Sequence, residues 1–381
     1  MKNAICEMFG IEFPLFAFSH CRDVVVAVSR AGGFGVLGGA AFTPDDIEPE
    51  LKWIDEHIDG KPYGVDVLIP ENLVIKGEKG VTARELAARV PQKHKDFVSD
   101  LLRKYDVEPT QIRETTREHR PDEAPSMQED QAIRLLEVAF RHPIKLIANA
   151  LGVPPQRMLD LGHKHGVPVA ALAGAPEHAV RHVKAGVDII VAQGGEAGGH
   201  CGEVATIVLI PEVVRAIKPI GNVPVLAAGG IMTGRQMAAC MAMGAAGAWT
   251  GSVWLATTES ETSEIFREKM VAARSRDTVR SRCRTGKPSR QLKSAWTEAW
   301  ESPQSPGALP MPFQSFLSGP ALQAVDQAAE RGNQKARELV TYFVGQGVGL
   351  VDSVKSSRQV VQEFKQDFAD AIADLQAMVE E

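Results

Sequence analysis

The sequence predicts a single α/β domain over residues 1–381, folded as a (β/α)8 TIM barrel with a long helical insertion after the third strand and a C-terminal extension. Eight short apolar segments recur along the chain, and most of them end in glycine or polar residues. Segments this apolar are typical of strands that are buried on both faces of a parallel sheet. Helical patterns lie between most of them, and eight such units at fairly even spacing favour a closed barrel over an open doubly wound sheet.

The predicted strands are residues 13–18, 33–39, 63–69, 144–151, 168–174, 188–195, 224–230 and 247–254. The helix predicted over residues 43–60 begins with Thr43 as its N-cap, has an acidic first turn and ends at Gly60. Further helices are predicted within residues 23–33, 154–166, 175–186, 210–217 and 233–244. Several of these end on glycine, as helix C-termini commonly do.

Two segments interrupt the even spacing of the barrel units. Residues 70–142 form the insertion, in which 82–107 has the pattern of one amphipathic helix and 108–130 is charged and poor in apolar residues. Insertions after barrel strands emerge on the active-site face, so this one is expected to be a lid or an oligomer contact, unless it is a helical excursion without a role. Residues 281–316, rich in Pro, Ser and Trp, are predicted as an extended wrap, and residues 353–381 as a helix.

The composition excludes several classes of protein. A net charge of −6, with 44% hydrophobic and 24% charged residues, is that of a soluble globular protein and argues against nucleic acid as a partner. No apolar run approaches the roughly 18 residues of a membrane helix, and the N-terminus lacks the layout of a signal peptide. The five cysteines lack metal-ligand spacing, so we expect no metal site, no disulfides and a cytoplasmic protein.

Two glycine-containing loops predict a phosphate site. The seventh predicted strand ends in Gly229 and Gly230, and the eighth contains Gly251 and Ser252. In barrels the loops after strands seven and eight together form the common phosphate site, although close packing also selects glycine. Arg235 is the one basic residue close in sequence, so the backbone is expected to carry most of the binding.

The stretch AQGGEAGGHCGE, residues 192–203, follows the sixth predicted strand on the same face of the barrel. Gln193 can offer both a donor and an acceptor to the edge of a heterocycle. His200 is the candidate catalytic residue, with a hydrogen-bonded loop histidine as the alternative, and His20 is a secondary candidate on this face. Four histidines on helical patterns are expected to be solvated: His163, His165, His178 and His182.

At these residues the sequence resembles the nitronate monooxygenase family, formerly called 2-nitropropane dioxygenases. The segments that carry the resemblance are AQGGEAGGHCGE, LAAGGIMTGRQMAACMAMGAAGAWTGSVWLATTES, RTGKPSRQLKSAWTEAWE, VGQGVGLV and, nearer the N-terminus, AVSRAGGFGVLGG and KPYGVDVLIPEN. The resemblance covers most of the chain except residues 70–142. Its GGH and GGI segments are shared with flavin-dependent enoyl-ACP reductases.

The resemblance implies an FMN cofactor across the top of the barrel and His200 as the catalytic base. It places Gln193 and Gly198 at the flavin, and it assigns the phosphate region to Gly230, Trp249, Thr250, Gly251 and Ser252. Asp66 stands where the family often has asparagine, and an ionised acid there would present only acceptors, which puts its flavin contact in doubt. The segment FAFSHCRD also departs from the family pattern on the substrate side of the pocket.

The implied reaction begins when neutral His200 removes the α-proton of a nitroalkane. The nitronate then reduces FMN, and O2 completes the conversion to a carbonyl compound and nitrite. The alternatives are an FMN-dependent NAD(P)H:quinone or enoyl reductase on the same barrel, a phosphate-binding isomerase or aldolase without flavin, and a flavin-binding protein without turnover. The physiological substrate, the use of NAD(P)H and a homo-oligomeric state are left open.

Overall fold

The computed structural model describes residues 1–71, 78, 81–108 and 128–379. Eight parallel strands close a barrel in the order β1-β2-β3-β4-β5-β6-β8-β9. Their bounds are β1 (Leu15–Ser19), β2 (Phe34–Gly38), β3 (Tyr63–Leu68), β4 (Leu146–Ala150), β5 (Val169–Ala173), β6 (Ile189–Gln193), β8 (Val225–Ala228) and β9 (Gly247–Thr250). Seven of them lie within the predicted apolar segments, and β1 extends one residue past its segment to Ser19, so the predicted barrel is confirmed. The last segment is strand only as far as Thr250 and continues as a 3-10 helix, η3 (Ser252–Ala256).

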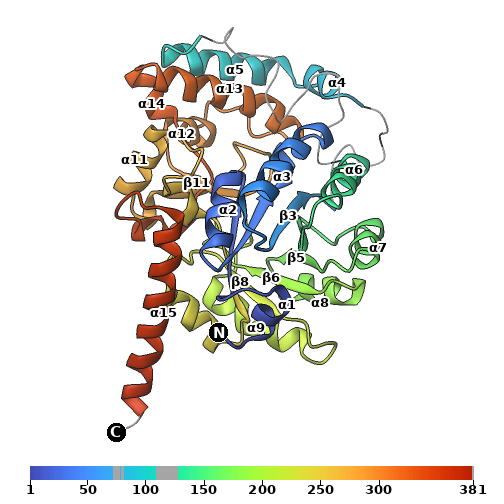
Figure 1. Cartoon of the computed structure of the whole chain (residues 1–381). Helices are drawn as coiled ribbons and strands as arrows, with labels where there is room; N and C mark the ends of the chain where they lie inside the picture. Colours follow the sequence, from blue (N-terminus) through green and yellow to red (C-terminus); the bar gives the residue numbers. More distant parts are fainter. Residues whose placement is uncertain (72–77, 79–80, 109–127, 380–381) are drawn as a thin grey trace.

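Helices cover the outside of the barrel (Figure 1). The barrel interior is packed by buried side chains that include Phe16, Phe34 and Leu226. The short helix α1 (Ala4–Phe9) places Phe9 against two of these rings, at 5.5 Å from Phe16 and 4.8 Å from Phe34. The amino-terminal end of the barrel is therefore packed with side chains, which leaves the carboxyl ends of the strands for a site.

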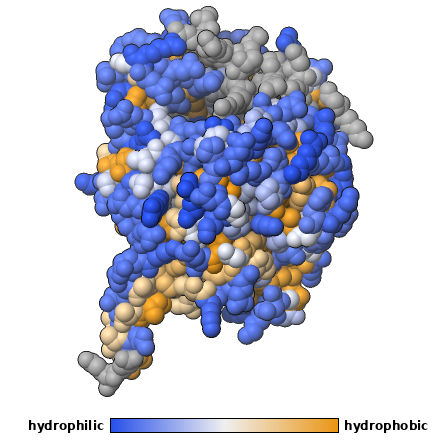
Figure 2. Space-filling model, in the orientation of Figure 1, coloured by the Kyte–Doolittle hydropathy of each residue, from blue (hydrophilic) through white to orange (hydrophobic). Residues whose placement is uncertain are grey.

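The outer ring consists of α2 (Arg22–Arg30), α3 (Pro44–His57), α6 (Glu129–Ala139), α7 (Gln156–Lys164), α8 (Pro176–Ala185), α9 (Thr206–Ile217), α10 (Gly234–Ala242) and α15 (Ser357–Val379). Helix α15 packs on α10 and α2 and so closes the ring. Its last turns project beyond the barrel, where Figure 2 shows apolar side chains along the helix; Ile372, Leu375 and Met378 are exposed there. Helix α9 begins at Thr206, earlier than predicted.

The insertion differs from the prediction in two ways. Residues 82–107 form two helices, α4 (Ala83–Ala88) and α5 (Gln92–Lys104), because Pro91 has no N–H to continue the first one. Helix α6 is the regular barrel helix between β3 and β4, and its Ile133 and Leu136 pack in the main core. The inserted part is thus shorter than residues 70–142, and most of the charged stretch 108–130 lies outside the described residues. The lid or oligomer-contact role stays a prediction.

A second hydrophobic cluster lies over the carboxyl side of the barrel. Residues 281–316 are not an extended wrap, because this part of the chain forms a hairpin and helices that build the cluster with α4 and α5. The elements are α11 (Glu264–Ala272), β10 (Thr278–Ser281), β11 (Ser289–Leu292), α12 (Ala295–Glu301), α13 (Phe313–Glu330) and α14 (Gln334–Leu339). Trp296, Val325 and Leu102 are fully buried there. Strand β11 also pairs with β7 (Gly199–His200), which connects the layer to the glycine-rich loop.

One predicted exposure is wrong. His182 is buried, and its Nε2 lies 3.0 Å from the carbonyl oxygen of Leu172 at the end of β5.

Within the described ranges, no helix combines the length and apolar character that crossing a membrane requires. The same residues contain no group of side chains arranged to hold a metal ion.

Candidate functional site

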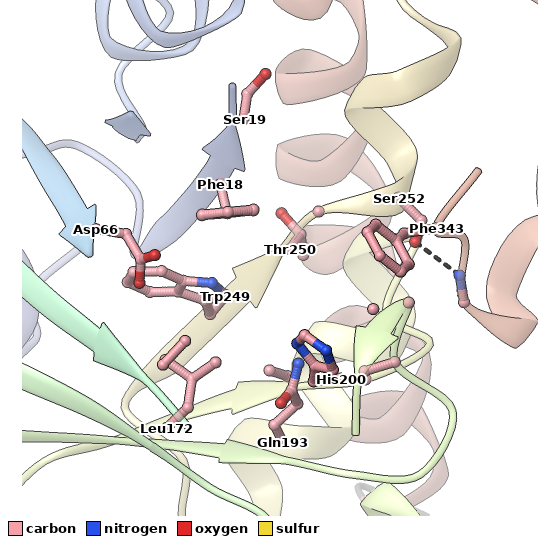
Figure 3. Close-up of a pocket in the computed structure, with 18 of the residues that line it drawn as sticks. Phe18, Ser19, Asp66, Leu172, Gln193, His200, Trp249, Thr250, Ser252 and Phe343 are labelled. Carbon is pink, nitrogen blue, oxygen red and sulfur yellow. Dashed lines mark hydrogen bonds between the residues drawn. The ribbon is translucent and has the colours of Figure 1, made fainter. Parts of the chain in front are cut away.

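A pocket of about 320 Å³ opens at the carboxyl ends of the barrel strands (Figure 3). Its wall contains every site residue predicted from the sequence: Asp66, Gln193, Gly198, His200, Gly230, Trp249, Thr250, Gly251 and Ser252. His20 also lines it, with Nδ1 at 3.0 Å from the carbonyl oxygen of Gly38. Residues from five separate strand ends therefore meet in one cavity, as expected of a barrel.

The loops after β8 and β9 present unpaired backbone donors to this pocket. The N–H groups of Gly229, Gly230 and Ile231, like that of Gly251, donate to no acceptor among the described residues. Gly229 and Gly230 have φ of 112° and 71°, values that favour glycine and turn the chain sharply at the strand end. Helix α10 begins four residues later, so its positive end is close. Free N–H groups beside a helix N-terminus suit an anion such as a phosphate.

Arg235 does not contribute to this cradle. Its guanidinium pairs with Asp374 on α15, with Nη2 and Oδ2 2.9 Å apart, and its backbone N–H donates to Asp367. In place of a charged side chain, the loop after β9 offers Ser252, whose Oγ accepts from the N–H of Gly345 at 2.9 Å. The serine proton remains available for an anion. Binding of an anion here would rest on backbone and hydroxyl donors and not on Arg235.

The glycine-rich loop after β6 is held in place by protein contacts. Both carboxylate oxygens of Glu196 accept from the N–H of Thr206, at 2.9 and 3.1 Å, so the loop caps helix α9. A Cβ on Gly198 would lie 2.8 Å from the nitrogen of Gly345. The glycine at 198 is therefore required by a neighbouring backbone segment, whereas the sequence suggested close approach to a cofactor.

His200 reaches the pocket because β7 pairs with β11, where its register partner is Ser289. Its Nε2 lies 2.8 Å from Thr285 Oγ1, and the ring of Phe343 is 6.2 Å away. Removal from water, and secondarily the positive charge of Lys287, lowers the pKa of His200 to about 4. The imidazole is thus neutral at pH 7.

The contact with Thr285 limits how this imidazole can act. Thr285 Oγ1 also lies 3.2 Å from the carbonyl oxygen of Lys287, which can only accept. When the hydroxyl donates to that carbonyl, Nε2 of His200 carries the proton and donates to Oγ1. This arrangement leaves the lone pair of Nδ1 free, and Nδ1 has no partner among the described residues. In the opposite arrangement the hydroxyl donates to Nε2 and the proton of the neutral ring is on Nδ1, so neither ring nitrogen has a free lone pair.

Asp66 lies inside the barrel at the end of β3 and is only 4% exposed. Its carboxyl group lines the pocket and has no hydrogen bond or ion pair among the described residues. Burial raises the pKa of Asp66 well above its ordinary value, and no charged neighbour adds to or offsets that effect. A protonated carboxyl group offers a donor as well as an acceptor, whereas an ionised one offers only acceptors.

Three pocket residues were missed by the sequence reasoning: Phe18, Thr285 and Phe343. Phe18 stacks with the predicted Trp249, with ring centroids 6.5 Å apart, and the two rings form an apolar wall, seen in Figure 3. Phe343 lies under the guanidinium of Arg284, 4.8 Å from its carbon. Thr285 lies in the quoted segment RTGKPSR, and Phe343 directly precedes VGQGVGLV. These segments were the available signal, but nothing in them assigned a role to either residue.

Comparisons with known proteins show which proteins this chain is similar to. The family model described as nitronate monooxygenase matches residues 2–367. A Mycobacterium tuberculosis protein named "Putative monooxygenase Rv1533" is 51% identical over 381 residues, which is 100% of both chains. A "Probable nitronate monooxygenase" of Staphylococcus saprophyticus is 26% identical over 96% of this chain and 98% of its own.

Solved structures share the fold over almost the whole chain. A nitroalkane oxidase from Streptomyces ansochromogenes superimposes with a TM-score of 0.78 at 24% identity, covering 98% of this chain and 100% of its own. FabK from Thermotoga maritima gives a TM-score of 0.70 at 25% identity and covers 99% of each chain.

Proposed function

The chain belongs to the nitronate monooxygenase family of flavin-dependent oxidoreductases, and from this premise we propose that it uses FMN and O2 to convert alkyl nitronates or nitroalkanes to a carbonyl compound and nitrite. The observation that carries the proposal is the meeting, in one pocket, of a neutral histidine with a free ring nitrogen and a cradle of backbone N–H donors. The substrate is a small molecule.

The residues present fit an FMN group. The free N–H groups of the loops after β8 and β9, with the hydroxyl of Ser252, would hold its phosphate. Gln193 would offer a donor and an acceptor to the ring edge, and the rings of Phe18 and Trp249 supply an apolar wall. The pocket volume is within the range of small-molecule sites, about 300–1,000 Å³. When bound, FMN would accept the electrons of the substrate.

His200 would act as the general base at Nδ1. Being neutral at pH 7, it can take the α-proton of a nitroalkane without first losing one. The ring then becomes a cation, and its Nε2–H bond to Thr285 Oγ1 becomes charge-assisted and stronger. The negative charge that develops on the nitronate beside the ring offsets the low basicity that burial imposes. A preformed nitronate needs no such proton transfer.

The test compares His200→Asn with the wild type on nitroethane and on preformed ethylnitronate. Asparagine keeps a polar side chain but cannot serve as a base, so we expect nitroethane turnover to fall about 10²- to 10⁴-fold. The visible spectrum of bound flavin should persist, and nitronate turnover should change much less. Unchanged nitroethane turnover would exclude His200 as the base, and a colourless wild-type protein with no affinity for added FMN would exclude the proposed function.

A second candidate is reduction of a quinone or an enoyl thioester by NAD(P)H, which the fold similarity to FabK favours. Anaerobic addition of NADH or NADPH separates the two activities. Rapid bleaching of the flavin by a pyridine nucleotide would support the reductase, whereas bleaching by nitronate alone would support nitronate oxidation.

A further inference from the structure

We propose that Asp66 enters the flavin site as a protonated carboxylic acid and donates a hydrogen bond to the flavin. The inference rests on the proposed FMN site and concerns how one wall of it recognises the cofactor. It would make cofactor retention weaken at high pH.

The first support is the placement of Asp66 in the barrel. Strand β3 buries Val65 and Val67 in the core between barrel and helices, and Asp66 lies on the opposite, inward face. Its register partners are Gly38 on β2 and Ala148 on β4, neither of which has a polar side chain. The inward face of either neighbouring strand therefore offers no polar side chain to the carboxyl group. Asn149 of β4 lies on the other face and bonds to Ile69 and Gly152.

The second support is that no cation lies near the carboxyl group among the residues that the structure describes. Strands β2 and β4 and the 3-10 helix η1 (Gly39–Ala41) contain no charged residue, and α2 and α6 pack on the outer face of β3. The other titratable side chains on the pocket wall, within the described part of the chain, are His20, His200 and Tyr342. None forms a hydrogen bond or an ion pair with Asp66. A carboxylate at this place would be buried without compensation, which is costly.

The third support is that the acid faces the pocket. Asp66 is 4% exposed, yet it lines the same cavity as the apolar side chains of Leu68 and Trp249. A neutral carboxyl group resembles a side-chain amide in carrying both a donor and an acceptor. A flavin ring offers carbonyl oxygens and ring nitrogens that can accept such a proton, whereas an ionised Asp66 would repel them.

The first experiment needs no flavin. Full-length wild-type protein, Asp66→Asn and Asp66→Ala are stripped of cofactor and unfolded in urea between about pH 5 and pH 9. The unfolded aspartate is ionised above about pH 4, whereas the folded one keeps its proton, so wild-type stability falls as pH rises towards the folded pKa. We expect the unfolding constant of the wild type to rise by up to about tenfold per pH unit relative to either variant. A ratio that does not change with pH would overturn the proposal.

The second experiment measures FMN affinity by quenching of flavin fluorescence. At neutral pH, Asp66→Asn should bind FMN within about threefold of the wild type, and Asp66→Ala about 3- to 10-fold more weakly. Wild-type affinity should fall at alkaline pH, and that of Asp66→Asn should not. Equal losses in Asp66→Asn and Asp66→Ala would overturn the donor role. If the wild type binds no FMN at all, the proposed function fails, while the unfolding comparison still tests the proton on Asp66.

Discussion

Replacing Thr285 by valine removes a hydroxyl that contacts the proposed base while keeping the shape of the side chain. In the wild type, Oγ1 lies 2.8 Å from Nε2 of His200. During proton abstraction this contact becomes a bond to a cation, and hydrogen bonds to charged groups contribute about 1.5–3 kcal/mol. Loss of that amount in the transition state corresponds to about a 10- to 150-fold decrease in rate.

The assay compares initial rates of Thr285→Val and wild type on nitroethane and on ethylnitronate at one O2 concentration. We expect kcat/KM for nitroethane to fall by the factor above and that for the nitronate to change less than about threefold, because it needs no proton transfer. Thr285→Ser retains a hydroxyl and should recover most of the rate. Equal losses on both substrates, or no loss on nitroethane, would refute the role of Thr285 in positioning His200.

Three further predictions concern pH, packing and the second core. Because the pKa of His200 is lowered to about 4, kcat/KM for nitroethane should stay flat from about pH 7 to about pH 5, where an ordinary histidine of pKa near 6.5 would give a decline of about 30-fold. Gly198→Ala should destabilise the fold by about 1–3 kcal/mol in urea unfolding and weaken FMN binding, because the new Cβ would lie 2.8 Å from a backbone nitrogen. Gly319→Ala is the control, because Gly319 has open space around it, and it should not destabilise the fold. Leu102→Ala, fully buried, should cost about 2–5 kcal/mol, whereas the 55% exposed Leu375→Ala should cost less than about 0.5 kcal/mol; similar values for both would contradict the second core.

Local pattern was enough to predict the barrel. Strands buried on both faces need continuous apolar residues, and such a run can be recognised from each segment alone. Barrel geometry then predicted that Gln193, Gly230 and Ser252 share one face, because all follow carboxyl ends of parallel strands. The structure brings them into one pocket.

The sequence pattern gave wrong predictions where the packing of a helix or the burial of a side chain depends on residues distant in the chain. Helix α6 looks like part of the insertion in sequence, and only its packing in the main core marks it as a barrel helix. His182 has the spacing of a surface residue, but its side chain is buried and the carbonyl oxygen of Leu172 accepts a hydrogen bond from its Nε2. Strands β10 and β11 have four residues each and helix α12 has seven, so their arrangement depends on the second core that they share with α5.

The sequence by itself determined the number and order of the strands, the loops that line the site and the candidate base. Only the tertiary structure decided the chemical state of that site. The partner of His200 is Thr285, 85 residues away, and the contact exists because β7 pairs with β11. The pKa of Asp66 is raised because its carboxyl group is buried between two strands that contain no charged residue. The sequence gives the identity of a side chain, but its pKa and its hydrogen bonds depend on the neighbours that folding places around it.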